Sequence, residues 1–575
     1  MKINLKNILL MSIFIFMLIG ICGVNAQEVS NDTTSSDLYD NTQISTDSVD
    51  NNALNSNIDN NVEKITAKQK NIKTDEDSID ITNENYNQLG TYMNQYSTLN
   101  FADDFDGKTI EITNGVTVTS TSDYTFTNSH FIVNANGVTI NNLNIVNTDN
   151  SDSSAIFVNG KNNVNINNNH ITVTKTTTGP TFAIELNGTT NSVINSNTIV
   201  VNAYPQAKQW INTSATNYIG LVKVSGIVVD DSDYVDVTNN DITVTNATET
   251  GYSTSTFEGI TIRNESTYVS TRNNDIDVSN ANYTYGISIE KSDRCNATYN
   301  TIALTSENYV CGIEVMEDKH ILLSHNTITG TAYKYEETNL VGESFAYGIY
   351  LSANYITDMT QNVTVTYNTI NLNSDISYGI EGYKITGLIL FLNTLYNDIS
   401  YNDVTVNGAV AMGMGFNQTS MTDIENNIIK VTAYNRTLGY CVEAVPPTTT
   451  GIKVITSSVD IKNNHILVNE NNAVVDTIYA VILQSASTVQ NNYLTSNYPT
   501  SQQLTGNSAV YKASWSYIVS GNVAYDLTQS NNNIILLNKV KSNIKSDSKT
   551  IVLNASTFQN MLQMDNLMTM SHKGM

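Results

Sequence analysis

Three charged residues follow the same short motif in three consecutive stretches of the sequence. Asp230, Arg263 and Glu290 each come directly after Gly-Ile-x-Ile or Gly-Ile-x-Val. In polysaccharide-cleaving enzymes one carboxyl group protonates a leaving oxygen while a second group takes a proton or attacks the sugar. If the three stretches lie side by side, these residues form a candidate catalytic row. The alternative is a ladder of alternating charges that stabilises the pairing of neighbouring strands.

Two aspartates, Asp241 and Asp275, occupy equal positions in the motif Asn-Asp-Ile. On neighbouring strands they would lie about 4.8 Å apart. Two carboxylates at that distance repel each other, so one keeps its proton or both share a cation. Calcium prefers oxygen ligands, and the pair is therefore a candidate calcium site. The sequence suggests no other cofactor.

Aromatic residues gather in the longest insertions between the repeated motifs. Their rings could stack on the apolar faces of sugars, as recognition loops do on a rigid scaffold. The alternative is that the rings pack their own loops against that scaffold. The candidate ligand-binding residues are Tyr204, Trp210, Tyr218, Tyr333, Tyr335, Tyr434 and Tyr440.

The elements that would position these residues come from an internal repeat. The intervals from Asn274 to Asn300 and from Asn300 to Asn326 are both 26 residues, and each Asn opens the motif Asn-x-Ile. Every unit contains short stretches in which apolar and polar residues alternate, which is typical of strands. The intervals between these strands are too short for crossover helices. The repeated residues are Asn169, Asn197, Asn240, Asn274, Asn300, Asn326, Asn368, Asn402, Asn427, Asn464, Asn492 and Asn522.

Such units can be joined without helices if each one is a turn of a solenoid, because every strand then pairs with its counterpart one turn later. The pattern predicts an all-β protein with roughly 13 coils of about 26 residues plus insertions. The repeated Asn suits a sharp turn, since Asn tolerates positive φ better than other residues with a side chain. Its amide could also join the amides of neighbouring coils in a ladder.

The N-terminus predicts export. Lys2 and Lys6 precede an apolar run over residues 8–22, and Val24-Asn25-Ala26 is a small-residue cleavage pattern. This combination is typical of a secretory signal peptide. No second long apolar stretch follows, so we expect an extracellular or cell-surface protein without a membrane span after cleavage.

The amino-acid composition indicates which partners are disfavoured and how the chain is divided into parts. Acidic residues outnumber basic ones 54 to 28, which gives a net charge of −26 and disfavours binding to nucleic acid. An Asn-, Ser- and Thr-rich segment follows the signal peptide and is expected to be disordered. The expected parts are a signal peptide (1–26), a disordered spacer (27–95), a parallel β-helix domain (96–540) and a C-terminal cap or tail (541–575).

The sequence resembles right-handed parallel β-helix proteins with pectate-lyase-like repeats, over about residues 100–540. Within that group it is most similar to the secreted adhesin-like proteins of methanogenic archaea. The resemblance rests on the signal peptide, the Asn-rich spacer, the segment Asn134-Ala-Asn-Gly-Val-Thr-Ile-Asn-Asn-Leu-Asn-Ile-Val and the Asn-x-Ile coils. It implies a fold shared by lyases, hydrolases and binding proteins, and so implies several functions.

Three functions agree with these observations. The first is a non-catalytic, adhesin-like surface protein whose loops bind glycans or surface proteins of other cells, or the cell's own wall. The second is a polysaccharide lyase or glycoside hydrolase that acts on an acidic or neutral polysaccharide through Asp230, Arg263 and Glu290. The third is a structural spacer of the cell envelope, for which loop deletions would change nothing but the length of the rod.

Overall fold

The computed structural model describes most of the region predicted to be β-helical. The described residues are 77–177, 179–203, 223–246, 256–332, 344–353, 360–384, 394–417, 419–434, 448–455, 459–471, 477–484 and 488–496, with strand segments at 510–512, 518–520, 522–526, 534–537, 540–541 and 552–553. All of them belong to one compact unit, Lys70–Met570. The predicted signal peptide and most of the predicted spacer fall outside these residues.

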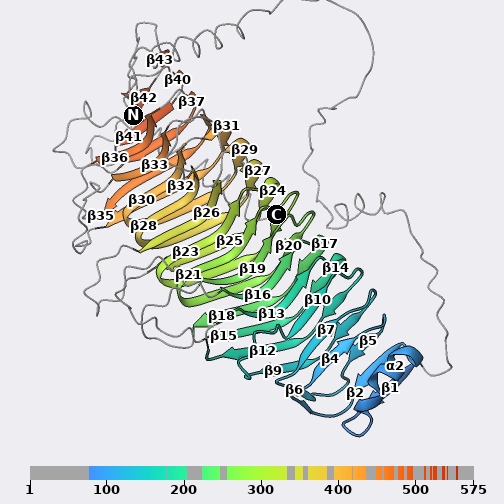
Figure 1. Ribbon diagram of the computed structural model, residues 1–575. Coiled ribbons are helices and arrows are strands. Elements are labelled where there is room, and N and C mark those ends of the chain that lie inside the picture. The colour runs from blue at the N-terminus through green and yellow to red at the C-terminus, as the bar shows by residue number, and fades with distance from the viewer. Residues whose placement is uncertain are drawn as a thin grey trace, which may run out of the picture. The chain divides into compact units, whose positions relative to one another are not determined.

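The described chain forms a parallel β-helix, as predicted, in which each coil contributes three strands (Figure 1). The first strand of a coil carries the Gly-Ile motif in seven of the coils, and we call it the glycine strand. The glycine strands are β4 (Thr109–Ile112), β7 (His130–Val133), β10 (Ile156–Asn159), β13 (Thr181–Asn187), β16 (Lys223–Asp230), β19 (Thr256–Arg263), the later parts of β21 (Asp275–Glu290), β23 (Thr301–Met316), β28 (Thr369–Lys384) and β30 (Asp403–Asn417), and β26 (Phe345–Ala353), β33 (Thr448–Ile455), β36 (Thr477–Gln484) and β39 (Val510–Lys512).

The second strand of each coil belongs to a separate sheet, which we call sheet A. Its parallel strands are β1 (Ser78–Ile81), β2 (Thr98–Phe101), β5 (Thr117–Thr119), β8 (Thr139–Asn141), β11 (Asn165–Asn167), β14 (Thr190–Asn195), β17 (Asp233–Thr238), β20 (Ser270–Arg272), β22 (Asn296–Thr298), β24 (Lys319–Ser324), β27 (Thr360–Thr366), β29 (Thr394–Ser400), β31 (Thr419–Glu425), β34 (Val459–Lys462), β37 (Thr488–Gln490) and β40 (Ile518–Ser520).

The third strand of each coil follows the repeated Asn, and we call it the asparagine strand. In four coils it runs on into the next glycine strand as one long element, so both kinds of strand lie in one sheet. The asparagine strands are β3 (Phe105–Asp106), β6 (Thr125–Thr127), β9 (Asn144–Asn147), β12 (His170–Lys175), β15 (Thr198–Ala203), β18 (Asp241–Asn246), the early parts of β21, β23, β28 and β30, and β25 (Thr327–Ala332), β32 (Ile428–Tyr434), β35 (His465–Asn471), β38 (Tyr493–Ser496) and β41 (Asn522–Asp526).

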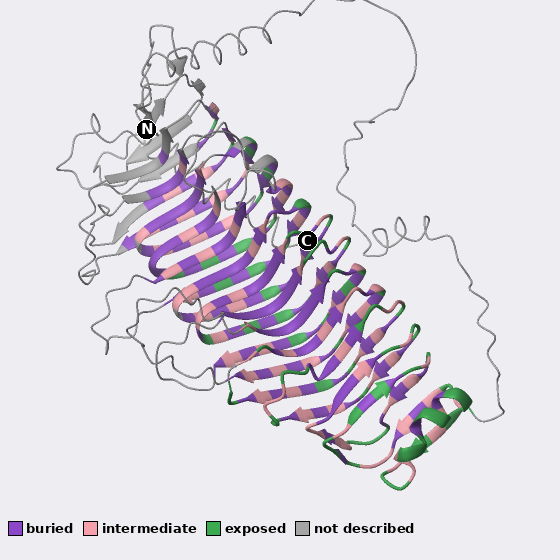
Figure 2. Cartoon of the chain, viewed as in Figure 1, coloured by how far each residue is buried: buried purple, intermediate pink, exposed green. Residues whose placement is uncertain are grey.

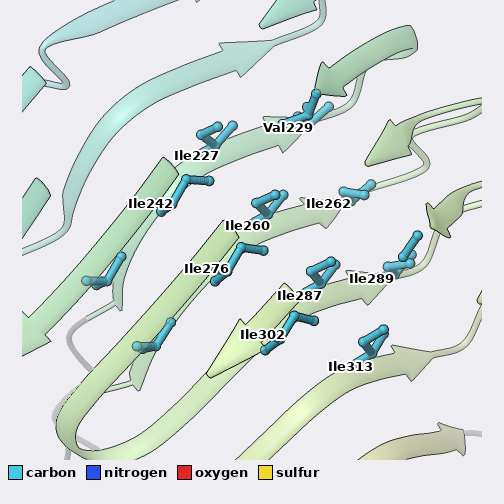
Figure 3. Close-up of a cluster of buried hydrophobic side chains, with 14 of the residues drawn as sticks. Ile227, Val229, Ile242, Ile260, Ile262, Ile276, Ile287, Ile289, Ile302 and Ile313 are labelled. Atoms are coloured by element: carbon cyan, nitrogen blue, oxygen red, sulfur yellow. The ribbon is translucent and has the colours of Figure 1, made fainter. Parts of the chain in front are cut away.

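The core lies inside the coil and is built from columns of identical or similar side chains. Ile227, Ile260, Ile287 and Ile313 are register partners on successive glycine strands, and all are fully buried. Figure 3 shows this column beside the matching isoleucines of the asparagine strands. Buried and exposed residues alternate along the strands, as Figure 2 shows, because successive side chains of a strand point to opposite faces.

The repeated Asn forms the predicted ladder at the corner between sheet A and the asparagine strands. The Asn274 Nδ2 donates to Asn300 Oδ1 at 3.0 Å, and Asn300 Nδ2 donates to Asn326 Oδ1 at 3.0 Å. The same amides also donate to backbone oxygens, so the buried polar groups are satisfied. The expectation of positive φ at the repeated Asn is wrong, however, because the left-handed residue is the one before it, such as Tyr299 with φ 57°.

The opposite corner needs glycine because the chain of the next coil comes very close. A Cβ on Gly226 would lie 2.5 Å from Ile242 Cγ2 and 2.8 Å from the carbonyl oxygen of Gly259. This close approach at the residue before Ile fixes which residues of the glycine strand face outward.

Both ends of the described stack depart from the repeat. Strand β1 begins at Ser78, and it is followed by the 3₁₀ helix η1 (Tyr86–Gln88) and helix α2 (Leu89–Gln95), which buries Leu89 and Met93. The predicted boundary at residue 95 is therefore too late, because β1 already pairs with β2. At the other end β42 (Ile534–Leu537), β43 (Val540–Lys541) and β44 (Val552–Leu553) pair antiparallel, which ends the parallel stacking. Among the described residues, no helix is long and apolar enough to cross a membrane.

Candidate functional site

The structure brings the predicted charged row together on adjacent glycine strands. Asp230 pairs in register with Arg263, and Arg263 pairs with Glu290. The Arg263 Nε donates to Asp230 Oδ2 at 2.7 Å, and Asn264 Nδ2 donates to Asp230 Oδ1 at 2.6 Å. Both oxygens of this buried aspartate are thus already held. The geometry agrees with the alternating-charge ladder, and a catalytic role for the row stays a prediction.

A second set of carboxyl groups lies on the glycine strands β19, β23 and β28 and was not foreseen from the sequence. Glu258 directly precedes the glycine of its strand, whereas Glu314 and Glu381 follow the glycine by two positions. Since the glycine interrupts the alternation of side chains, both positions lie on the side of the strand away from the buried Ile260 column.

These carboxyl groups are held by neighbouring hydroxyl groups. The Thr261 hydroxyl donates to Glu258 Oε2, and Thr261 Oγ1 also lies 3.0 Å from the hydroxyl of Ser225 on the preceding coil. The Ser288 hydroxyl donates to Glu314 Oε2 at 3.4 Å. The hydroxyls therefore fix the carboxyl groups on a surface that continues across neighbouring coils.

Burial changes the protonation of these groups. It raises the pKa of Glu314 to about 7, and the nearby charges of Glu258 and Glu290 act in the same direction. Burial likewise raises the pKa of Glu381 to about 7, although the charge of Lys453 opposes the shift. A carboxyl group with such a pKa carries a proton in part of the population at neutral pH, and can then donate a hydrogen bond.

Four tyrosines continue this surface across four coils. The ring centroids of Tyr285 and Tyr309 lie 5.5 Å apart, those of Tyr309 and Tyr347 5.3 Å, and those of Tyr347 and Tyr378 5.2 Å. All four rings are half-buried. Burial raises the pKa values of Tyr285, Tyr309 and Tyr347, so their hydroxyl groups stay neutral. We call the surface formed by Glu258, Tyr285, Tyr309, Glu314, Tyr347, Tyr378 and Glu381 the tyrosine–glutamate face.

The two aspartates predicted to bind calcium are register partners, as their sequence positions indicated. Asp241 on β18 pairs with Asp275 on β21, and both side chains are exposed. Calcium takes about six to eight oxygen ligands, more than this pair offers. Within the described segments, no group of three or more His, Cys, Asp and Glu side chains could hold a metal ion. Asp241 and Asp275 alone therefore supply too few ligands for calcium, and calcium binding at this pair stays an expectation.

The predicted aromatic loop residues cannot be placed. Tyr204, Trp210, Tyr218, Tyr333, Tyr335 and Tyr440 lie outside the described residues, and of Tyr434 only the backbone is described, at the end of β32. The ligand-binding role assigned to them remains a prediction. The tyrosines that the structure does place together lie on the strands.

Comparisons with known proteins give only distant similarities. No family model matches the sequence, and no curated protein matches it. The chain is similar to the solved structure of PfbA, a surface adhesin of Streptococcus pneumoniae, with 10% identity, a TM-score of 0.34 and coverage of 81% of this chain and 93% of that one. It is also similar to a tailspike protein of E. coli bacteriophage HK620, with 12% identity, a TM-score of 0.40 and coverage of 80% and 82%.

A third similar structure is a complex of the alginate lyase AlyF-OU02, with 13% identity, a TM-score of 0.34 and coverage of 71% of this chain and 89% of that one. Identities and TM-scores this low relate these proteins to the chain through the general arrangement of their strands alone.

Proposed function

We propose that this protein is an exported, adhesin-like surface protein that binds a neutral glycan on the tyrosine–glutamate face. The observation that supports the proposal is the continuous row of Tyr285, Tyr309, Tyr347 and Tyr378 beside carboxyl groups with raised pKa values. Its partners would be glycans on other cells or in the cell's own wall. Export by the signal peptide and a relation to archaeal adhesin-like proteins are parts of this proposal.

The chemistry of the face suits a sugar chain better than a charged polymer. Tyrosine rings cover the apolar faces of sugars, and neutral hydroxyl groups exchange hydrogen bonds with sugar hydroxyls. A protonated Glu314 or Glu381 can donate to a sugar oxygen, while an ionised one can accept. When ionised, the carboxyl groups of Glu314 and Glu381 would repel an acidic polysaccharide. The row also runs along the stack of coils, which fits a linear chain.

The proposal is tested by measuring binding and product release together on a panel of neutral polysaccharides. Wild-type protein should bind at least one of them. Tyr309→Ala and Tyr347→Ala together should weaken that binding at least tenfold, with Tyr309→Phe and Tyr347→Phe as the control that keeps the rings. Binding that survives the double alanine variant, in protein with unchanged far-ultraviolet circular dichroism, would exclude this face.

A second candidate function is hydrolysis of the bound glycan. It is favoured by one observation, the pKa of about 7 at Glu314 next to Glu290 on the adjacent coil. A general acid with that pKa and a second carboxylate are the two groups a glycoside hydrolase needs. Reducing ends released by the wild type and lost in Glu314→Gln would support hydrolysis. Binding of the glycan without release of reducing ends would support the non-catalytic function. A protein that binds no glycan would favour the structural spacer.

A further inference from the structure

A different surface of the coil, on sheet A, gathers exposed apolar side chains. In the part of the chain whose side chains are described, every exposed large apolar residue lies near the start of a sheet A strand or at a turn that borders this sheet, and every one has positive φ. These residues are Tyr234, Tyr268, Tyr299, Tyr367, Tyr401 and Met421. Large residues elsewhere on the described coils are covered, so this position is unusual.

Four aromatic rings stack on one another along one border of sheet A. The ring centroids of Tyr299 and His325 lie 4.5 Å apart, those of His325 and Tyr367 4.9 Å, and those of Tyr367 and Tyr401 5.0 Å. The guanidinium of Arg272 lies over the first ring of the stack, 5.5 Å from the Tyr299 centroid. Among the described contacts, the hydroxyls of these three tyrosines make no hydrogen bond. They form a row in which Tyr299 and Tyr367 are two coils apart, with His325 between them, and Tyr367 and Tyr401 are one coil apart.

The backbone does not explain why aromatic residues occupy this border. The equivalent turn residues of neighbouring coils are Asn239, Asn273, Asn426 and Asn463, which all have positive φ as well. Asn adopts this conformation readily, whereas a bulky residue there is strained. Strained residues of this kind are typical of ligand-binding sites. Stacking between the rings compensates for part of the strain, but it does not require the rings to be exposed.

The charge of this surface is opposite to that of the chain. Arg272, Arg294 and Lys319 lie on or beside the middle strands β20 to β24. Asp293 lies among them and pairs with Arg294, and the nearest acidic residue on the preceding strand, β17, is the exposed Asp236. In the described part of the chain, neither Arg272 nor Lys319 pairs with a carboxylate. The chain as a whole carries −26, so the unpaired Arg272 and Lys319 contrast with its overall charge. Acidic residues return on sheet A further along, at Asp398, Asp423 and Asp460.

Small uncharged side chains fill the strip between its two borders. Asn296, Thr298, Ser324, Thr364 and Thr366 alternate with core residues on β22, β24 and β27, and Leu322 is the one larger apolar side chain among them. Such side chains leave room for a ligand to lie along the coils. The edges of the stacked aromatic rings carry a partial positive charge, which attracts anions. We define the basic strip as Arg272, Arg294, Lys319, Tyr299, His325 and Tyr367 together with these small residues.

We propose that the basic strip of sheet A binds an anionic glycan, one that carries carboxylate or sulfate groups along its length. Arg272 and Lys319 would attract the anionic groups, while the tyrosine hydroxyls would bond to sugar oxygens. This site does not depend on the proposed function, because it uses a different sheet and the opposite ligand charge. The protein would thus hold two kinds of glycan on separate surfaces.

The test measures binding of the full chain to polygalacturonate, dextran sulfate and uncharged dextran. Wild-type protein should bind at least one of the two polyanions, more tightly at about 0.05 M than at 0.5 M salt, because salt screens exposed charges. The triple variant Arg272→Thr, Tyr299→Asn and Tyr367→Asn should lose at least tenfold in affinity. It should fold normally, since Thr and Asn occupy these columns in neighbouring coils. Polygalacturonate and dextran sulfate distinguish carboxylate from sulfate recognition.

Two control variants, which change residues outside the basic strip, test whether the loss of polyanion binding is specific to the strip. Met421→Asn changes an exposed residue with the same positive φ outside the strip and should leave polyanion binding unchanged. Tyr309→Ala with Tyr347→Ala, on the tyrosine–glutamate face, should leave it unchanged too. Failure of the wild type to bind either polyanion, or equal binding by the triple variant, would overturn the proposal. So would equal affinity for uncharged dextran, or self-association that the triple variant abolishes while polyanion binding persists.

Discussion

At the scale of single residues, packing between neighbouring coils changes the pKa values of individual side chains. Glu314 sits where a strand residue faces outward, but the side chains of adjacent coils cover it and raise its pKa. Cys295 shows the opposite outcome on the inner side, where burial raises the pKa of the thiol to about 12 and leaves an unreactive apolar residue. The sequence allowed Cys295 to be interpreted as buried, because its column otherwise carries Val269 and Ile321.

The raised pKa of Glu314 predicts a dependence of stability on pH. Between its ordinary value of 4.5 and its folded value of about 7, the folded chain holds a proton that the unfolded chain has released. The free energy of unfolding therefore falls as pH rises through this range, and levels off above it. Glu314→Gln should raise the melting temperature relative to wild type at pH 8 and have little effect at pH 4. Thermal unfolding at both pH values checks this.

The matching control is Glu111→Gln, the same substitution at an exposed carboxylate on β4 whose register partner is Ile132. It should show no comparable gain at pH 8. If the two variants behave alike, or if Glu314→Gln gains as much at pH 4 as at pH 8, the carboxyl group at Glu314 is not protonated by its surroundings.

At the scale of elements, the strands were predictable and the details of the corners were not. Alternation and the 26-residue interval indicate two or three short strands per coil, and the structure has three. The register of Asp230 with Arg263 follows from the same alignment. Glu258 was missed because the glycine interrupts the alternation, so the residue before it returns to the outer side. The side of the strand on which Glu258 lies depends on how closely the glycine approaches the next coil. The sequence of one repeat does not show that approach.

The asparagine ladder predicts a large loss of stability at one position. Asn300 accepts from Asn274 and donates to Asn326 and to the Thr271 carbonyl, all while buried. Asn300→Ala leaves several of these groups without a partner and should lower the free energy of unfolding by about 2–4 kcal/mol. Denaturant unfolding measures the change. The exposed Asn371→Ala should stay within about 0.5 kcal/mol of wild type. Equal losses would mean that the ladder adds nothing.

The glycine corner makes a second prediction for the elements. Gly226→Ala places a Cβ 2.8 Å from the Gly259 carbonyl oxygen and should destabilise the protein by about 2 kcal/mol or more. Gly90 lies in α2, where an added Cβ meets nothing, so Gly90→Ala should be neutral or stabilising by up to about 1 kcal/mol. Denaturant unfolding of both variants checks the pair. A tolerated Gly226→Ala would contradict the close approach between coils.

At the scale of the whole coil stack, residues at equivalent positions of successive coils form continuous surfaces. The tyrosine–glutamate face follows the glycine strands, and the basic strip follows sheet A, so each surface is a line along the coils. The sequence allowed the stack itself to be predicted, since every unit repeats the same pattern. It gave no means of placing the insertions, because they do not repeat, and the predicted aromatic loop residues stay untested for that reason.

Because coils contact mainly their neighbours, removal of one whole unit should be tolerated. Deletion of residues 275–300 joins Asn274 to Thr301, which stands where Asp275 stood in the repeat. The shortened protein should keep its far-ultraviolet circular dichroism and unfold cooperatively. As a control, deletion of residues 275–287 removes half a coil and should prevent folding. If both deletions fold equally well or fail equally, the coil is not the unit of stability.

The most direct test of glycan binding on the tyrosine–glutamate face is amide hydrogen exchange with and without the neutral polysaccharide that binds best. The account predicts slower exchange in the glycine strands that carry Tyr285, Tyr309 and Tyr347, within β21, β23 and β26, and little change in β20, β22 and β24 of sheet A. Slower exchange confined to sheet A, or none in the glycine strands of a protein that demonstrably binds the polysaccharide, would contradict it.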